Sequence, residues 1–391
     1  MVLRIRKVLN IIIKSFSYFQ LFLIPRVLQR LFFLVRIFNT IFIMKSLAEY
    51  KDEIHSCSKC GLCQSVCPIY KITGNDCTVS RGMFIMLKQI IKGELKMSKN
   101  LNRYLDLCLK CNACTKFCPS GIDVVDIIAS AKAEYFKQHK TEKLKSAILK
   151  LLLKLPRLLH KFTPKAKSKT FEKKVIYFGG CGSTLKTEKA IVKLLNSANI
   201  EVIIPEFECC GYPFFVRGDT ESYKACIDKF YNTLNKYGIY EVVTNCAACE
   251  KTLNSVSKIY NNINFNIKNV FGYIKENNLK LELNKEKTVT YHKPCDLDNF
   301  ENVKWILENT KNLNYIEMKD FDECCGFEGL TNFNNRKILS EIFKQKHENI
   351  KNTGAKTVLT SCLACAVTLK LHSHNKYKVQ DFAEFLAKNI K

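Results

Sequence analysis

Two cysteine-rich runs in the first third of the chain contain the residues best suited to chemistry. Both read Cys-x2-Cys-x2-Cys-x3-Cys-Pro, and they contain Cys57, Cys60, Cys63 and Cys67, then Cys108, Cys111, Cys114 and Cys118. Three thiolates set so closely can wrap one side of a small iron–sulfur cluster, and the proline then turns the chain away. The spacing therefore predicts two [4Fe-4S] clusters and an electron carrier.

The paired runs resemble those of two-cluster bacterial ferredoxins, in which the fourth cysteine of each run binds the other cluster. By this resemblance one cluster is held by Cys57, Cys60, Cys63 and Cys118, and the other by Cys108, Cys111, Cys114 and Cys67. Structural zinc is the alternative, but zinc sites prefer two Cys-x2-Cys pairs separated by a loop. Four cysteines within each run favour iron and sulfide.

The second half of the chain repeats itself, and each copy carries five cysteines. The two sets are Cys181, Cys209, Cys210, Cys246 and Cys249, then Cys295, Cys324, Cys325, Cys362 and Cys365, at offsets of 114, 115 and 116 residues. Each set has one isolated cysteine, an adjacent pair before glycine, and a final Cys-x2-Cys. Such a repeat indicates two copies of one structural unit.

Five thiolates exceed what one zinc ion or one four-iron cubane requires. The surplus predicts an unusual iron–sulfur cluster in each copy, or a cluster beside a spare reactive thiol, with structural zinc as the alternative. Glycine after the adjacent pair lets the backbone approach a bulky ligand. His292, three residues before Cys295, is either a ligand or proton-transfer group, or a histidine that is merely hydrogen-bonded at a strand end.

Short strands and helices must position these cysteines. β-branched runs occur at 175–178, 202–204, 242–244, 288–291 and 357–360, with helical patterns at 187–198 and 336–349. This alternation predicts two α/β lobes with parallel sheets and with ligands at the carboxyl ends of strands. Around the first eight cysteines, the patterns at 80–91, 101–107 and 121–135 predict helices instead.

The pattern Cys-x27/28-Cys-Cys-Gly-x34/35-Cys-x2-Cys, present twice, resembles the cysteine-rich "CCG" domain family. A ferredoxin-type domain ahead of two such domains is similar to the iron–sulfur subunits of glycolate oxidase and of anaerobic glycerol-3-phosphate dehydrogenase, and to the catalytic iron–sulfur subunit of heterodisulfide reductases. The resemblance covers residues 50–391. It implies an α+β multidomain fold, with a helical two-cluster ferredoxin-type domain followed by two tandem α/β CCG domains.

We divide the chain on this basis into five parts. They are an N-terminal extension (1–43), the ferredoxin-type domain (44–135), a basic linker (136–174), a first lobe or CCG domain 1 (175–285) and a second lobe or CCG domain 2 (286–391). Ser80-Arg81-Gly82, after the first run, looks closest to the glycolate oxidase type. Arg81 there either faces a cluster or partner, or makes a surface salt bridge.

The terminal cysteine pairs depart from the glycolate oxidase type, which often lacks part of them. This chain keeps Cys246 with Cys249 and Cys362 with Cys365. Complete sets resemble the heterodisulfide reductases, whose CCG domains carry noncubane four-iron clusters that handle disulfide substrates. The resemblance implies one or two further, noncubane clusters here, each held by one of the five-cysteine sets.

The net charge of +26 is concentrated in two stretches. Residues 1–43 contain seven basic residues and no acidic one, and residues 136–174 contain thirteen basic and two acidic ones. We expect no nucleic-acid partner, because no recognition motif accompanies this charge. An anionic membrane surface fits the interleaved apolar residues better.

The linker contains a stripe of apolar residues at helical spacing, Leu144, Ile148, Leu151, Leu152 and Leu155. The stripe predicts a helix that either lies on phospholipid or packs on the protein itself.

Residues 1–43 allow several interpretations. Their longest uncharged run, Ser15–Pro25, is too short to span a bilayer, and no signal-peptide cleavage pattern follows. The segment is an interfacial helix, or disordered, or sequence upstream of a true start at Met44. The grouped cysteines argue against a disulfide framework. We therefore expect a cytoplasmic protein, with peripheral contact to the inner face of the cytoplasmic membrane as a further possibility.

A dinucleotide-binding fingerprint is missing, because Gly179-Gly-Cys-Gly is too short and lacks its third glycine. We therefore expect no flavin on this chain, and hydride chemistry must belong to a partner. The leading hypothesis is an oxidoreductase subunit that passes electrons from an FAD-containing dehydrogenase acting on glycolate or lactate towards quinone, a membrane subunit or another acceptor. A heterodisulfide-reductase-like thiol–disulfide oxidoreductase is the second hypothesis, and a zinc-stabilised scaffold is the third.

Overall fold

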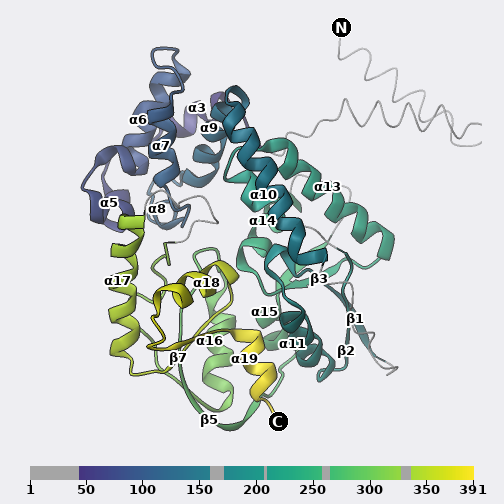
Figure 1. Cartoon of the computed structure of the whole chain (residues 1–391). Coiled ribbons are helices and arrows are strands. Elements are labelled where there is room, and N and C mark those ends of the chain that lie inside the picture. The colour runs from purple at the N-terminus through teal and green to yellow at the C-terminus, as the bar shows by residue number, and fades with distance from the viewer. Residues whose placement is uncertain (1–43, 159–170, 207–208, 258–264, 327–335) are drawn as a thin grey trace, which may run out of the picture. The chain divides into compact units, whose positions relative to one another are not determined.

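The computed structural model describes residues 44–158, 171–206, 209–257, 265–326 and 336–391. The N-terminal extension, and with it the three interpretations of residues 1–43, lies outside this part. The described residues confirm the predicted fold class, a helical domain followed by two α/β lobes (Figure 1).

Helices build the ferredoxin-type domain. They are η1 (Leu47–Tyr50), α3 (Lys51–His55), α4 (Leu62–Val66), α5 (Pro68–Thr73), η2 (Asp76–Thr78), α6 (Ser80–Ile91), α7 (Lys99–Leu107), α8 (Ala113–Lys116) and α9 (Val124–Gln138). The core lies between α6, α7 and α9, where Phe84, Leu87, Leu105, Ile127 and Ala131 are buried. Apolar residues three and four positions apart place one face of each helix in this core.

Each lobe contains a four-stranded parallel sheet. The strands are β1 (Lys173–Tyr177), β2 (Ile200–Ile203), β3 (Glu241–Thr244) and β4 (Asn266–Asn269), then β5 (Glu282–Tyr291), β6 (Lys311–Tyr315), β7 (Thr357–Thr360) and β8 (Lys378–Asp381). The orders are β2-β1-β3-β4 and β6-β5-β7-β8, so the second sheet repeats the first. In register, Ile176 pairs with Val242 and Thr290 with Val358. The strand order reverses beside β1 and β5, which is where ligands bind in open parallel sheets.

The helices of the lobes cover these sheets. They are η3 (Gly180–Gly182), α11 (Leu185–Asn196), α12 (Tyr212–Phe215), α13 (Thr220–Tyr237), α14 (Ala247–Ser257) and α15 (Val270–Glu276), then α16 (Phe300–Asn309), α17 (Arg336–Asn352), α18 (Leu363–His372) and α19 (Phe382–Asn389).

One hydrophobic cluster spans the two lobes. Ile191 and Leu195 of α11 belong to the same buried cluster as Tyr291 of β5 and Phe382 of α19. The C-terminal helix α19 packs on α11, where the Lys193 amino group donates to the Ala387 carbonyl oxygen at 2.6 Å (Figure 1). The two lobes therefore pack directly against each other.

The ferredoxin-type domain contacts both lobes. Lys71 in α5 pairs with Glu323 of the second lobe at 3.0 Å. On the first lobe, Gly218 fits so closely against α9 that a Cβ there would lie 2.4 Å from the backbone nitrogen of Ala133. These contacts fix the cluster-binding runs relative to the lobes.

Much of the linker forms helix α10 (Lys140–Leu158), which includes Pro156. Leu149 on one face is buried in the core of the first lobe. The predicted apolar stripe faces outward: Leu144, Ile148, Leu151 and Leu152 are 63, 50, 64 and 52 % exposed. The helix therefore packs on the protein, but through residues other than this stripe. No described helix is long and apolar enough to cross a membrane.

Candidate iron–sulfur centres

The two ferredoxin-type runs adopt the same backbone. In the first, Lys59 and Gly61 flank Cys60 with φ of 59° and 85°; in the second, Lys110 and Asn112 flank Cys111 with φ of 49° and 58°. Left-handed residues on both sides of the middle cysteine bend the backbone into a tight loop. Each loop is followed by a short helix, α4 or α8, that contains the third cysteine.

The two runs line two neighbouring cavities. The lining of the first includes Cys57, Cys60, Cys63, Cys114 and Cys118. The lining of the second includes Cys67, Cys108, Cys111 and Cys114. The fourth cysteine of each run thus lines the cavity of the other run, as the predicted crossed ligation requires. Each cavity thus has in its lining the four thiols that the predicted ligation assigns to it, which fits a [4Fe-4S] cluster. The assignment of individual ligands stays a prediction.

The five cysteines of each lobe gather at the carboxyl ends of its strands. Cys181 and Cys246 follow β1 and β3, and Cys295 and Cys362 follow β5 and β7. The adjacent pairs form equivalent turns, because Gly211 and Gly326 have φ of 87° and 85°. The amide of each glycine donates to the sulfur of the first cysteine of its pair, Cys209 or Cys324, at 3.4 Å.

Within each lobe the thiols are in mutual contact. The Cys325 and Cys365 sulfurs lie 3.3 Å apart. Contact with Cys325 and burial raise the pKa of Cys365 well above its ordinary value. In the first lobe, contacts with Cys209 and Cys249 instead lower the pKa of Cys210 to about 6. Several buried thiolates at such distances repel one another unless a cation lies between them, so the donor sets fit a metal cluster.

The centres form a continuous series. Cys114 lines both ferredoxin-type cavities, so the two share a wall. Cys111 of the second cavity contacts the Cys324 thiol of the second lobe, and this contact, together with burial, raises the pKa of Cys111 well above its ordinary value. Ile69 and Leu109 pack around the junction. Adjacent thiols thus connect the first ferredoxin-type site to the second lobe.

Comparisons with known proteins agree with this geometry. The model of the 4Fe-4S dicluster domain matches residues 53–122, and that of the cysteine-rich domain matches residues 175–254 and 289–370. The chain belongs to the CCG-domain iron–sulfur oxidoreductase family.

Two curated relatives resemble this CCG-domain protein along most of its length. The probable glycolate oxidase iron–sulfur subunit of Bacillus subtilis is 23% identical over 404 residues, which cover 83% of this chain and 91% of that protein. One subunit of the dihydromethanophenazine:CoB–CoM heterodisulfide reductase of Methanosarcina acetivorans is 22% identical over 357 residues, 80% of this chain and 87% of that one. Both are named as subunits of oxidoreductases.

One solved structure shares the fold. A hypothetical protein from Helicobacter pylori superposes with a TM-score of 0.50 over 82% of this chain and 69% of its own, at 13% identity. This likeness concerns the architecture alone.

Basic residues surround the predicted centres of the CCG-domain protein. Lys110, between Cys108 and Cys111, is 2 % exposed, and burial lowers its pKa to about 7. Lys346 in α17 is 1 % exposed and donates to the backbone oxygen of Asp320. Arg81 lines the first cavity and also pairs with Asp76 at 3.8 Å, so both interpretations of this residue describe part of its environment. Negatively charged, thiolate-bound clusters at these sites would favour the protonated, positively charged forms of these lysines.

His292 lies among the cysteines of the second lobe. Its ring is fully buried, and burial lowers its pKa well below the ordinary value. Its backbone amide continues the sheet by donating to Leu359. Burial lowers the pKa of the ring more than an interaction with the backbone of Phe321 raises it. Neither ring nitrogen makes a hydrogen bond of ordinary geometry among the described residues. The ligand role and the hydrogen-bonded ring both stay predictions.

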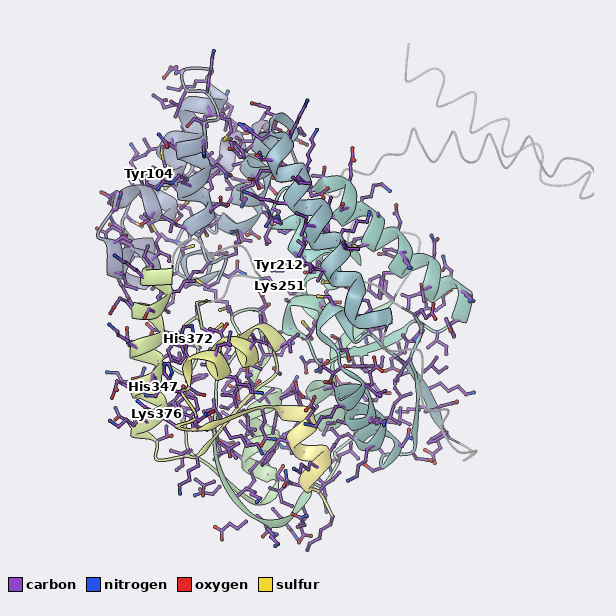
Figure 2. The ribbon with its side chains drawn as sticks, viewed as in Figure 1. Tyr104, Tyr212, Lys251, His347, His372 and Lys376 are labelled. Atoms are coloured by element: carbon purple, nitrogen blue, oxygen red, sulfur yellow. The ribbon has the colours of Figure 1, made fainter. Side chains whose placement is uncertain are left out.

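A polar junction between the three parts was not visible in the sequence. Asp296, next to Cys295, accepts from Asn112 of the ferredoxin-type domain at 3.4 Å and from Lys251 of the first lobe at 3.5 Å. Tyr212 lies nearby, and burial together with the charges of Asp296 and Cys295 raises its pKa well above the ordinary value (Figure 2). Only the adjacency of Asp296 to Cys295 and of Tyr212 to the Cys-Cys-Gly turn hinted at these residues.

Proposed function

We propose that this chain is the iron–sulfur electron-transfer subunit of a flavin-dependent 2-hydroxy-acid dehydrogenase complex. An FAD-containing partner oxidises glycolate or lactate, and its electrons pass singly through the clusters of this chain towards quinone or another acceptor. The observation that carries the proposal is the unbroken series of thiols from Cys60, through the shared wall at Cys114, to the contact between Cys111 and Cys324.

The entry point of this series is at the surface. Cys60 is the one exposed cysteine among the described residues. Leu62 and Phe117, close in sequence to Cys60 and Cys118, are 46 and 59 % exposed. Exposed apolar side chains beside a cluster suit a partner that must bring its cofactor close. The partner and this chain have different roles, because the flavin takes two electrons from the hydroxy acid and each cluster carries one electron at a time.

The test measures the visible absorption of the iron–sulfur clusters in a complex of this chain with its flavoprotein. The chain is purified without oxygen together with its flavoprotein, and glycolate or D-lactate is added while the visible absorption of the iron–sulfur clusters is recorded. Bleaching that requires both the hydroxy acid and the flavoprotein is the expected result. The control is Cys60→Ser, which removes a ligand of the entry cluster and should slow the bleaching. Clusters that stay oxidised beside a fully reduced flavin would contradict the proposal.

A heterodisulfide-reductase-like activity is the second candidate. It is favoured by the complete cysteine sets in both lobes and by their burial, with Cys209, Cys210, Cys324 and Cys325 all inside the protein. A disulfide substrate needs two electrons and two protons to yield two thiols, and clusters that bind its sulfurs would supply the electrons in two steps.

This candidate is tested without any flavoprotein. The anaerobic chain is mixed with reduced viologen dye and an organic disulfide, and dye oxidation is measured. Turnover that is lost on Cys362→Ser but kept in Cys77→Ser would support a disulfide reductase. Dye oxidation no faster than that without protein would eliminate it and leave the flavoprotein relay.

Peripheral attachment to the inner face of the cytoplasmic membrane is part of the proposal. Helix α10 supports it, because Leu144, Ile148, Leu151 and Leu152 are exposed on a helix that also carries lysines at 140, 143, 145 and 150. Apolar side chains bounded by lysines suit the boundary between acyl chains and anionic headgroups.

Vesicle sedimentation checks the attachment. The chain should sediment with phosphatidylglycerol-containing vesicles, and less with pure phosphatidylcholine. Replacement of Leu144 and Leu151 by glutamate should abolish sedimentation while iron content is retained. If the double variant sediments like the wild type, α10 is not the contact.

A further inference from the structure

The second lobe has a histidine beside its cysteines where the first lobe has a phenylalanine. His292 and Phe178 are separated by the same 114 residues as Cys295 and Cys181. Both residues directly follow the first strand of their sheet, β5 or β1, and both are fully buried. The duplicated lobes therefore offer different donors to their centres.

The imidazole of His292 is within reach of the same metal as two of the cysteines. One ring nitrogen and the sulfurs of Cys325 and Cys365 all lie within 4.8 Å of one another, and all three residues are buried. Neither nitrogen of the ring makes a hydrogen bond of ordinary geometry among the described residues, although the backbone of Phe321 interacts with the ring. A buried polar group without a partner is costly, because its lost hydrogen bonds to water are not replaced. A metal bound to the nitrogen would remove this cost, and imidazole is a common metal ligand.

The first lobe cannot make the same bond. Phe178 packs edge-on against Phe230, with ring centroids 5.3 Å apart, and belongs to the same buried cluster as Cys209, Cys210 and Cys249. Its ring has no lone pair for a metal. The contrast between the lobes is therefore one of ligand chemistry, within matching sheets and matching Cys-Cys-Gly turns.

We propose that His292 is a nitrogen ligand of the iron–sulfur centre in the second lobe, which makes this centre mixed in sulfur and nitrogen and leaves the first-lobe centre bound by sulfur alone. A neutral imidazole adds no negative charge to a cluster, whereas a thiolate does. Histidine in place of cysteine raises the reduction potential, as in Rieske centres. Where His292 takes a position on iron that a thiolate takes in the first lobe, the second-lobe centre has the higher potential of the two.

The second-lobe centre lies next to the ferredoxin-type domain. Cys324 of the second lobe contacts Cys111 of the ferredoxin-type domain. A cluster held in part by Cys111 would therefore lie beside a centre held in part by Cys324. A raised potential at that centre would favour electron transfer out of the ferredoxin-type domain.

The test is spectroscopic and needs no substrate or partner. The full chain is produced with ¹⁵N-labelled histidine, purified without oxygen and partly reduced, and the nitrogen couplings of each paramagnetic centre are measured by pulsed electron paramagnetic resonance. A strong histidine coupling that changes from the ¹⁴N to the ¹⁵N pattern on labelling is expected. The centre that shows it should be lost when Cys362 and Cys365 are both replaced by serine, and kept when Cys246 and Cys249 are.

Variants extend the test. His292→Phe copies the first lobe and should abolish the coupling and lower the potential of that centre, while His292→Gln should abolish the coupling with a smaller change of volume. The control is His347→Phe, because His347 lies on α17 with its Nδ1 3.4 Å from the Tyr377 hydroxyl and should leave the spectrum unchanged (Figure 2).

Three outcomes would overturn the proposal. They are a wild-type spectrum with no histidine coupling, a weak coupling typical of a hydrogen-bonded rather than a ligating nitrogen, and an iron content that does not fall in the Cys362/Cys365 double variant. None of them depends on the flavoprotein, so the inference and the proposed function fail separately.

Discussion

Gly218 tests how tightly the ferredoxin-type domain is held against the first lobe. The residue precedes α13, has φ of +79°, and faces the backbone of α9. A Cβ at this position would lie 2.4 Å from the nitrogen of Ala133 and 2.5 Å from the carbonyl carbon of Lys132. Gly218→Ala therefore forces two backbones apart, and no side chain can rotate away to relieve the contact.

The size of the effect follows from these distances. Ordinary contacts of a Cβ begin at 3.4 Å, so α9 and the turn must separate by about 1 Å. The positive φ costs alanine about 1–2 kcal/mol. Overpacking adds roughly 1–3 kcal/mol. We expect Gly218→Ala to destabilise the protein by about 2–5 kcal/mol, which lowers Tm by several degrees.

Gly238→Ala is the matched control. Gly238 ends α13 with φ of +64°, and no atom of the described residues lies within 4 Å of the position that a Cβ would occupy. This variant should lose only the conformational part, about 1–2 kcal/mol. The assays are thermal unfolding by circular dichroism and hydrogen exchange of α9. Faster exchange in α9 is expected for Gly218→Ala alone. Equal Tm values and equal exchange in the two variants would refute the packing argument.

Three further predictions concern iron, folding and pH. Cys60→Ser should lose about four irons per chain, whereas Cys77→Ser, whose thiol lines neither ferredoxin-type cavity, should lose none; iron analysis decides. Removing iron with a chelator should unfold α4 and α8, because these helices have no buried residues and short helices are marginal alone; unchanged amide exchange there would contradict this. Burial raises the pKa of Asp381 to about 6, so the folded state keeps a proton that the unfolded state loses near pH 4, and stability falls as pH rises between these values. The Tm of Asp381→Asn relative to that of the wild type should therefore be a few degrees higher at pH 8 than at pH 5. Thermal unfolding of both proteins at both pH values measures this difference.

The repeats made most of the fold predictable. Matching cysteines at offsets of 114 to 116 residues required two copies of one unit, and the β-branched runs before them indicated parallel strands with ligands at their carboxyl ends. Strands β4, β6 and β8 were missed, because sequences such as Asn266–Asn269 and Lys378–Asp381 are polar and lie at sheet edges. Propensity is weak at an edge, where pairing with the neighbouring strand decides the structure.

The cysteines of the candidate site were predictable, but their neighbours were not. Spacing indicated the cysteine runs, and the resemblance to two-cluster ferredoxins and to CCG domains implied which cysteines share a centre. The contact between Cys111 and Cys324, and the bridge from Asn112 through Asp296 to Lys251, join segments far apart in the chain. They depend on how the three parts pack, which no local pattern contains. The exposure of the α10 stripe is likewise a tertiary fact, because its periodicity fits a buried and an exposed helix equally well.

The hydrophobic cluster that spans the two lobes has a consequence for synthesis on the ribosome. Ile191 and Leu195 of α11 are covered in part by α19, which ends at Asn389. The apolar face of the first lobe therefore stays uncovered until α19 has left the exit tunnel, although the strands of that lobe are complete much earlier. Chains emerge from the N-terminus, and an exposed apolar face during that interval invites aggregation. Newly made chains should therefore bind chaperones until α19 has been synthesised. Nonsense mutations just before α19 should yield protein that is degraded rather than protein with partial activity.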